Sequence, residues 1–116
     1  MSETRIFIRN LELLARIGIH GHEQGKPQPV RFNVSLWTKT PTASDRLENA
    51  IDYEAVADKI RSLVAAGHIN LAETLAERIA SACLEDSRVS KVRVQVEKLH
   101  ALAGAEAAGV EIERER

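Results

Sequence analysis

The spacing of apolar residues changes twice along this chain, and that change limits the folds that it can adopt. Within residues 30–37, apolar and polar side chains alternate, which is typical of a half-buried strand. Between residues 53 and 83 the spacing lengthens to three or four, which is typical of helices that cover a core. Alternation returns within residues 91–97. We therefore expect strands on either side of a helical middle.

Two strands are expected before the helices. The first covers residues 4–17, where a bulge near Arg9 and Asn10 would bring two apolar phases onto one face. A loop rich in Gly and Pro follows at residues 18–29, and the second strand covers residues 30–37. This loop is long for a hairpin connection, so it is a candidate for carrying function.

Two more strands are expected after the helices. Residues 91–97 form the third strand, and Val110 and Ile112 belong to the fourth. A loop of small residues at 99–108 joins them. A polar turn at residues 41–48 separates the first strand pair from the helices.

The first helix is expected to begin after Asp52, which is a good N-cap residue, and to end at Gly67. Its inward face is predicted from apolar residues at helical spacing, which are Tyr53, Val56, Ala57, Ile60, Leu63 and Val64. The burial of this stripe against the sheet would hold the helix in place.

The second helix is expected to begin at Asn70. Asn70 would be its N-cap and Glu73 its third residue, an arrangement that resembles a capping box. Its inward stripe is predicted from residues spaced four apart with one alanine beside them, which are Leu71, Leu75, Ile79, Cys83 and Ala82. Glu73 either serves this helix start or, held ionised by the helix N-terminus, binds a ligand with paired N–H donors.

The order β-β-α-α-β-β predicts one α+β domain over residues 1–116, with a mainly antiparallel sheet covered on one face. Four strands leave two open edges, and such edges are usually protected or paired. We therefore expect copies of the chain to associate into a homo-oligomeric barrel.

The composition excludes several classes of partner. The formal net charge of -1 and the scarcity of aromatic residues argue against nucleic acid as a partner. There is no signal peptide and no run of 18 apolar residues, so we expect a cytoplasmic protein without a membrane partner. Cys83 is the single cysteine, which excludes an internal disulfide.

Three side chains have alternative interpretations. Lys98 continues the buried phase of the third strand, so it is either enclosed and suited to proton transfer or extended to water beyond the strand end. Tyr53 is either a core aromatic whose hydroxyl reaches the surface or a functional phenol. Glu23 lies in the Gly-rich loop, where a solvated carboxylate is the simplest interpretation.

The histidines give little support for a metal site. His20 and His22 form an H-x-H pair that needs a third ligand, and neither His68, His100 nor Cys83 has a recognised ligand spacing. The sequence also lacks a phosphate-binding Walker loop, a dinucleotide fingerprint and a nucleophile elbow, so no metal and no cofactor is expected.

Five segments carry a resemblance to a known family over nearly the whole chain. They are Ile17-Gly18-Ile19 with Glu23 and Gln28, Ile51-Asp52-Tyr53, residues 70–77, residues 94–98 and residues 109–114. In order and spacing they resemble dihydroneopterin aldolase and its relative, dihydroneopterin triphosphate epimerase. The resemblance implies the tunnelling fold, in which subunits join edge to edge as a tetrameric ring and two rings often stack into an octamer.

The resemblance also implies an active site between neighbouring subunits. By position, Glu73 would bind the 2-amino and N3 hydrogens of the pterin, with main-chain groups near Ala72, Ile51 and Ile19 holding the ring. Three side chains would be catalytic: Lys98 near N5, Tyr53 from the adjacent subunit, and Glu23 at the polar end of the pocket.

The implied reaction is the retro-aldol cleavage of 7,8-dihydroneopterin in folate biosynthesis, without metal, cofactor or Schiff base. Two alternatives stay open. The segment 98–102 departs from the Pro-rich turn of many aldolases and looks more like the epimerase branch, and His20, His22, Lys26 and His100 could meet a triphosphate. The other alternative is a non-catalytic, pterin-binding oligomer on the same fold.

Overall fold

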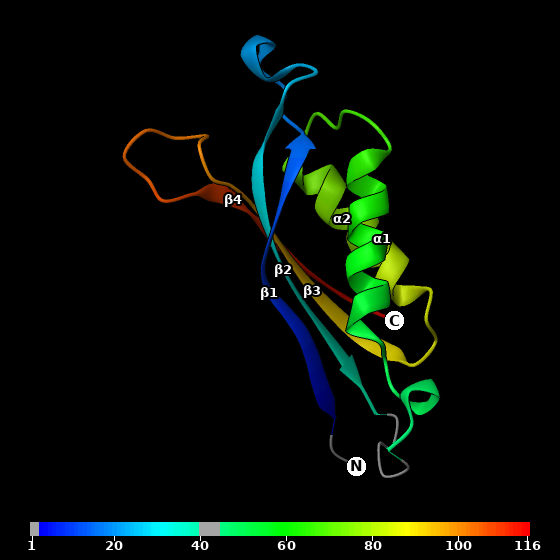
Figure 1. Ribbon diagram of the computed structural model, residues 1–116. Coiled ribbons are helices and arrows are strands. Elements are labelled where there is room, and N and C mark those ends of the chain that lie inside the picture. The colour runs from blue at the N-terminus through cyan, green and yellow to red at the C-terminus, as the bar shows by residue number, and fades with distance from the viewer. Residues whose placement is uncertain (1–2, 40–44) are drawn as a thin grey trace.

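The fold consists of a four-stranded antiparallel sheet with two helices packed on one of its faces (Figure 1). The computed structural model describes residues 3–39 and 45–116. The elements follow the predicted order β-β-α-α-β-β, which confirms the α+β class. Their bounds are β1 Thr4–Arg16, η1 Gly21–Glu23, β2 Pro27–Thr38, η2 Leu47–Asn49, α1 Tyr53–Ala65, α2 Ala72–Leu84, β3 Val89–Lys98 and β4 Ala108–Glu115, where η marks a short 3-10 helix.

The sheet has the strand order β1-β2-β3-β4, so β1 and β4 form its two edges. The predicted bulge in β1 is confirmed, because the register against β2 shifts between Ile8 and Leu11. Asn10 adopts a left-handed φ of 58° at this point, and its N–H donates to Asn33 Oδ1 at 2.8 Å. The bulge lets Ile8 and Leu11 both pack against the core.

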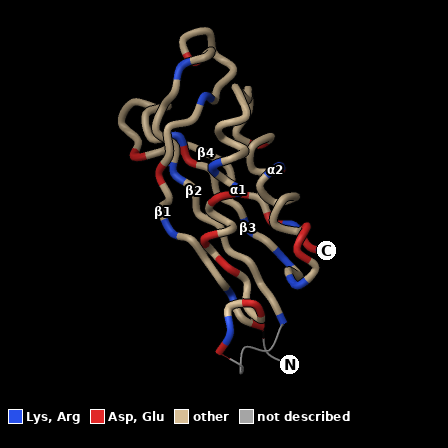
Figure 2. Tube along the Cα trace, turned by 45° about the vertical axis from the view of Figure 1, so that its right-hand side comes forward, with Lys and Arg blue, Asp and Glu red and all other residues tan. Residues whose placement is uncertain are grey.

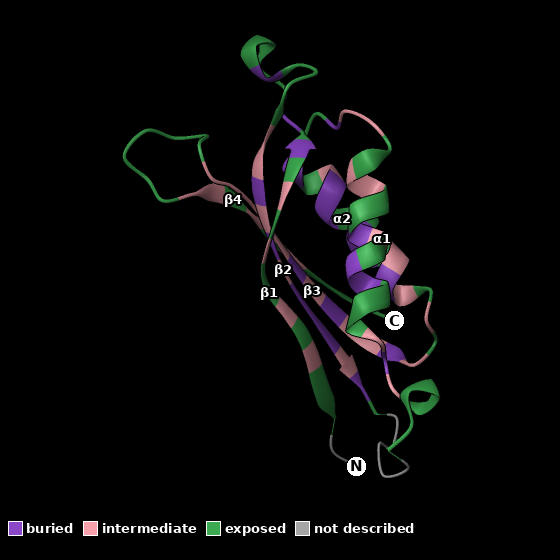
Figure 3. Ribbon diagram, in the orientation of Figure 1, coloured by how far each residue is buried: buried purple, intermediate pink, exposed green. Residues whose placement is uncertain are grey.

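The core lies between the sheet and the helices, where buried residues from both layers meet (Figure 3). The helices contribute Ile60, Leu75 and Ile79, each at most 1% exposed. Burying an aliphatic side chain of this size stabilises the fold by about 1.5–3 kcal/mol. The central strands contribute the alternating apolar residues that identified them in the sequence, which are Val30, Phe32, Val34, Leu36, Val92, Val94 and Val96.

Charged residues lie along the strands, between the apolar residues that face the helices (Figure 2). Arg31 donates to both carboxylate oxygens of Glu97 at 3.1 Å, and Arg93 donates to Glu113 at 2.8 Å. Each pair joins two neighbouring strands in register. The alternation of the strands therefore separates a helix-covered face from a polar one.

The start of α2 differs from the prediction. Asn70 is not the N-cap, because α2 begins at Ala72 and Leu71 occupies the N-cap position without a side-chain hydrogen bond. Glu73 is thus the second helical residue and forms no capping box. The reason is a tertiary contact: Ile69 pairs with the end of β1, through Ile69 N–H to Arg16 O at 3.0 Å, which keeps this segment extended.

The inward stripes are confirmed except at the first residue of each. Leu75, Ile79 and Cys83 are buried, but Leu71 is 44% exposed because it precedes the helix. Tyr53 is 60% exposed, so its assignment to the inward stripe of α1 is wrong. It is the first residue of α1, and burial on this helix starts one turn later, at Val56.

The two ends of α1 follow the predicted capping chemistry. Asp52 is the N-cap of α1 and accepts a hydrogen bond from Glu54 N–H at 2.9 Å. α1 ends at Ala65, and Gly67 follows in a left-handed conformation, with φ of 147°.

None of the helices in the described ranges is long and apolar enough to cross a bilayer.

Several loop boundaries move by a few residues. β2 begins at Pro27, and the remaining loop after β1 contains the short turn η1. β3 begins at Val89 and includes Lys98 as its last residue. The predicted polar turn at 41–48 is described only in part, because residues 41–44 lie outside the described residues. The short helix η2 begins at Leu47, near the end of this turn.

Candidate active site

An ion pair between Lys98 and Glu23 forms the centre of the candidate site. Lys98 Nζ lies 2.9 Å from Glu23 Oε2, and the two side chains are 19% and 7% exposed. Lys98 is therefore enclosed rather than extended to water. Because Lys98 is still within β3, paired with Val30 of β2, the sheet rather than a loop sets the position of its amine.

Glu23 is buried, so its interpretation as a solvated loop carboxylate is wrong. Its carboxylate accepts hydrogen bonds from Gln28 Nε2 at 2.9 Å, from Lys98 Nζ at 2.9 Å and from His20 N–H at 3.4 Å. The Gln28 and Lys98 contacts outweigh the opposing effect of burial and lower the pKa of Glu23 to about 2. The site therefore holds an ionised carboxylate at neutral pH.

Gln28 has a role that its place in the sequence does not indicate. Its side-chain amide donates to Ile17 O at 2.7 Å as well as to Glu23. It therefore joins the end of β1 to the carboxylate from its place near the start of β2. No local sequence pattern predicts these contacts, because Ile17 and Glu23 come close to Gln28 only when the loop folds back.

The loop after β1 and the start of α2 lie next to each other at one end of the molecule (Figure 1). Gly18 N–H donates to Ile69 O at 3.0 Å, and Gln24 Nε2 reaches Asn70 Oδ1 at 3.5 Å. Gln24 Nε2 also lies 3.2 Å from the carbonyl oxygen of Ile19. These contacts bring the predicted binding segment around Ile19 beside the turn that leads into α2.

The first turn of α2 presents two of the predicted binding residues differently. Ala72 is buried, at 8% exposure, whereas Glu73 is exposed. Among the described residues, the side chain of Glu73 has no hydrogen-bond or ion-pair partner. Its carboxylate at a helix N-terminus is therefore available to accept N–H donors from a ligand.

Ile51 and Tyr53 lie apart from the other predicted site residues. Both sit where α1 begins, whereas the loop after β1 and the start of α2 lie at the end of the molecule where α1 finishes (Figure 1). Glu23 belongs to that loop and contacts Lys98, and Glu73 belongs to that helix start. The 13 residues of α1 correspond to a helix about 20 Å long. One chain therefore does not bring Tyr53 to the Lys98–Glu23 pair.

A cavity of about 250 Å³ adjoins Glu23 and Gln28, between the loop after β1 and the loop after β3. His22, Lys26 and His100 all line it, so three of the four basic residues considered for triphosphate binding do converge. The fourth, His20, stacks its ring on His22 with the ring centroids 5.7 Å apart. Within the described residues, no three His, Cys, Asp or Glu side chains are grouped as metal ligands would be.

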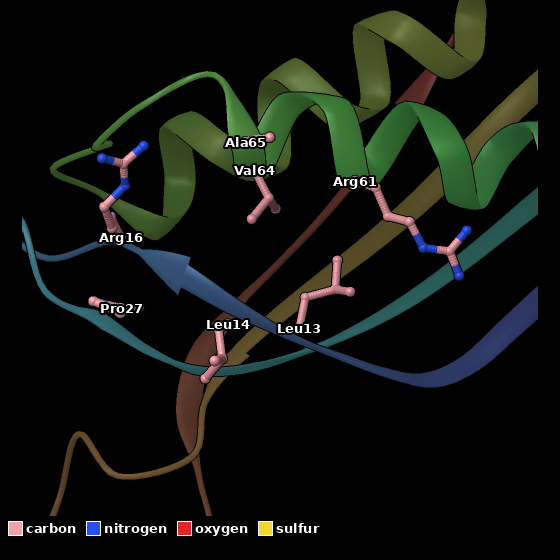
Figure 4. A pocket seen from close by; sticks show the side chains of 7 residues that line it. All are labelled: Leu13, Leu14, Arg16, Pro27, Arg61, Val64 and Ala65. Atoms are coloured by element: carbon pink, nitrogen blue, oxygen red, sulfur yellow. The ribbon is translucent and has the colours of Figure 1, made fainter.

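A second hollow, of about 380 Å³, lies between β1 and the last turns of α1 (Figure 4). Its apolar lining is flanked by two arginines, Arg16 and Arg61. None of the predicted site residues lines it, so it does not contribute to the candidate site. The complete lining is Leu13, Leu14, Arg16, Pro27, Arg61, Val64 and Ala65.

Comparison with known proteins points to one family. The family model described as "Dihydroneopterin aldolase" matches residues 6–113. A dihydroneopterin aldolase of Streptomyces coelicolor is 34% identical over 96 residues, which cover 81% of each chain. A dihydroneopterin triphosphate 2'-epimerase of Escherichia coli is 28% identical and covers 96% of this chain and 94% of its own.

The fold comparison agrees. The crystal structure of Escherichia coli dihydroneopterin aldolase in complex with neopterin superposes with a TM-score of 0.89 at 30% identity. The superposition covers 96% of this chain and 98% of the other. The family model and the fold comparison therefore both extend over nearly the whole chain.

Proposed function

The chain belongs to the dihydroneopterin aldolase family, and on that basis we propose that it cleaves 7,8-dihydroneopterin. The products are 6-hydroxymethyl-7,8-dihydropterin and glycolaldehyde, as a step of folate biosynthesis. The observation that carries the proposal is the enclosed Lys98–Glu23 pair, 2.9 Å apart, at the same end of the molecule as Glu73.

The reaction needs one base and one proton donor. A base removes the 2′-hydroxyl proton, the C1′–C2′ bond breaks, and glycolaldehyde leaves. The electron pair passes through C1′ and C6 to the imine nitrogen N5, which takes a proton. Protonation at C1′ and loss of the N5 proton then give the hydroxymethyl product.

Lys98 is the proposed donor to N5, acting through water. Its contact with the ionised Glu23 supports this role, because an amine paired with a carboxylate carries a proton that it can give and has no free electron pair with which to attack a carbonyl. The pterin ring itself accepts the electrons, so the step needs neither a Schiff base nor a metal. Tyr53 and an ordered water act on the side-chain hydroxyls.

Glu73 is the proposed anchor for the pterin ring. Its exposed carboxylate at the start of α2 matches the 2-amino and N3 hydrogens, a paired donor set that suits two carboxylate oxygens. Main-chain groups near Ala72, Ile19 and Ile51 complete the hold on the ring.

The site is proposed to form between two copies of the chain. The distance between the start of α1 and the Lys98–Glu23 pair supports this, because Tyr53 has to come from a neighbouring copy. The two sheet edges, β1 and β4, offer the surfaces through which copies would join into a tetrameric ring and an octamer.

A second candidate function is the 2′-epimerisation of dihydroneopterin triphosphate. The cavity beside Glu23 favours it, because His22, Lys26 and His100 line the space that a phosphorylated side chain would need. Breaking and re-forming the same C1′–C2′ bond on the opposite face would invert C2′, so both reactions use the same catalytic residues.

Turnover of the two substrates, measured in parallel, tests these proposals. Glycolaldehyde release from 7,8-dihydroneopterin at a higher kcat/KM than epimerisation of the triphosphate is the expected result. The reverse order would assign the chain to the epimerase branch. Tight pterin binding without turnover of either compound would leave the non-catalytic alternative and refute the enzymatic proposal.

A further inference from the structure

The imidazole of His68 holds both ends of the loop that carries Glu23. His68 lies between α1 and α2, with Nε2 2.8 Å from Gly18 O, and Gly25 N–H donates to its Nδ1 at 3.2 Å. Gly18 follows β1 and Gly25 precedes β2, so the first and last parts of the loop both contact the His68 imidazole. We infer that His68 is a positioning residue for the Glu23–Lys98 pair, an inference that rests on the proposed function.

The two backbone partners of His68 define its tautomer. A carbonyl oxygen can only accept, so Nε2 must carry the hydrogen that Gly18 O receives. A backbone N–H can only donate, so Nδ1 must be unprotonated to accept from Gly25. His68 therefore serves as a neutral, Nε2-protonated imidazole, with neither nitrogen left for a metal ion.

The contact reaches Glu23 through Gly18. A Cβ atom on residue 18 would overlap the carboxylate of Glu23, so the Gly18 backbone packs directly against that group. Fixing the Gly18 carbonyl thus fixes one wall of the space that Glu23 occupies. Glu23 in turn accepts the hydrogen bond from Lys98, so a series of contacts connects the His68 imidazole with the Lys98 amine.

His68 also links this loop to the residues that lead into α2. The next residue, Ile69, accepts from Gly18 N–H at 3.0 Å, and Asn70 accepts from Gln24 Nε2 at 3.5 Å. Glu73 follows within the first turn of the helix. The imidazole therefore ties the proposed acid–base pair and the proposed pterin anchor into one rigid unit.

Three variants test the inference kinetically. In His68→Leu both hydrogen bonds are lost, and kcat for 7,8-dihydroneopterin should fall by about 10²-fold while KM stays within about threefold. In His68→Gln an amide can still donate to Gly18 O, so kcat should recover to within about tenfold of wild type. Lys59→Met is the control, because it removes a single side-chain bond to Ala82 O, 3.0 Å long, outside the site.

The kinetic result overturns the inference if His68→Leu keeps the wild-type kcat. An equal loss of kcat in His68→Leu and Lys59→Met would also overturn the inference, because it would show that both substitutions act by general destabilisation. If wild type itself does not turn over the substrate, the proposed function fails, and the positioning role is then decided by spectroscopy alone.

Two spectroscopic measurements do not depend on turnover. In protein labelled with 15N-histidine, the His68 ring should show a protonated Nε2 and an unprotonated Nδ1 at neutral pH. The Gly25 amide should exchange with solvent about tenfold faster or more in His68→Leu, while the Ile60 amide within α1 is unchanged. An Nδ1-protonated ring, or unchanged exchange at Gly25, would contradict the inference.

Discussion

Gly18 packs its backbone against the carboxylate of Glu23, in space that no side chain on residue 18 could share. Gly18 also has a φ of 131°, in the left-handed region that disfavours other residues. Two independent constraints therefore require glycine here.

Gly18→Ala should displace Glu23 and lower kcat by about 10²-fold, because Lys98 loses its partner. Backbone strain should also lower the free energy of unfolding by about 1–3 kcal/mol. Gly21→Ala is the matched control: nothing lies within 4 Å of its added Cβ, and its φ is not positive. Urea denaturation and steady-state kinetics measure both effects, and equal behaviour of the two variants would contradict the prediction.

Stability should depend on pH through Glu23. Its folded-state pKa of about 2 lies below the ordinary value of 4.5, so its contribution is fully present above pH 4.5 and is lost as the pH falls towards 2. In Glu23→Gln that part of the pH dependence should disappear. The measurement is the free energy of unfolding of both proteins between pH 2 and pH 6.

Asp86 sets the background for that experiment. Its pKa is also lowered to about 2, chiefly by hydrogen bonds from Arg88, so wild type and Glu23→Gln should both keep the Asp86 slope. The informative quantity is the difference between the two curves. A constant difference across the whole range would show that Glu23 is not held ionised by its contacts.

Glu73 and Lys98 should separate binding from turnover. Glu73→Ala should abolish pterin binding. Lys98→Ala should still bind pterin, but its kcat should be lower by about 10²-fold or more, as expected when a proton-transfer group is lost. Glu85→Ala controls for the loss of one exposed carboxylate from the end of α2. Calorimetry measures binding, and wild-type activity in Lys98→Ala would refute its catalytic role.

Mixing inactive variants should reveal a site shared by two copies. Lys98→Ala and Tyr53→Phe, unfolded and refolded together in equal amounts, should recover about a quarter of the wild-type activity, because a fraction of sites combines an intact Lys98 with a neighbour's intact Tyr53. Lys98→Ala mixed with Glu23→Gln should recover nothing, since that pair lies within one chain. Equal recovery in both mixtures, or none in the first, would contradict the arrangement.

Arg88 should stabilise the segment that leads into α1. Its guanidinium donates to Ala50 O at 2.9 Å and to Asp86 Oδ2 at 2.7 Å. Arg88→Ala should lower the free energy of unfolding by about 1–3 kcal/mol, because hydrogen bonds to a charged group are lost. Arg93→Ala, which breaks the exposed pair with Glu113, should cost about 0–1 kcal/mol. Urea denaturation of both variants tests the difference.

The sequence by itself determined the order of the elements, the inward faces of the strands and the capping chemistry at the ends of α1. Alternation in β2 and β3 reports burial directly, because neighbouring side chains of a strand point to opposite faces. The same phase placed Lys98 on the inward side of the strand but left open whether its amine is enclosed or extends to water. The resemblance, rather than this pattern, supplied the roles proposed for Tyr53 and Glu73.

Only the tertiary structure decided which of these residues meet. The sequence does not show that Gln28 and Lys98 converge on Glu23, because both contacts depend on how the loop after β1 folds back. The later start of α2 depends on Ile69 pairing with the end of β1. The local spacing of apolar residues predicts the face to which a side chain points, whereas contacts between distant segments form only when the sheet and helices pack together.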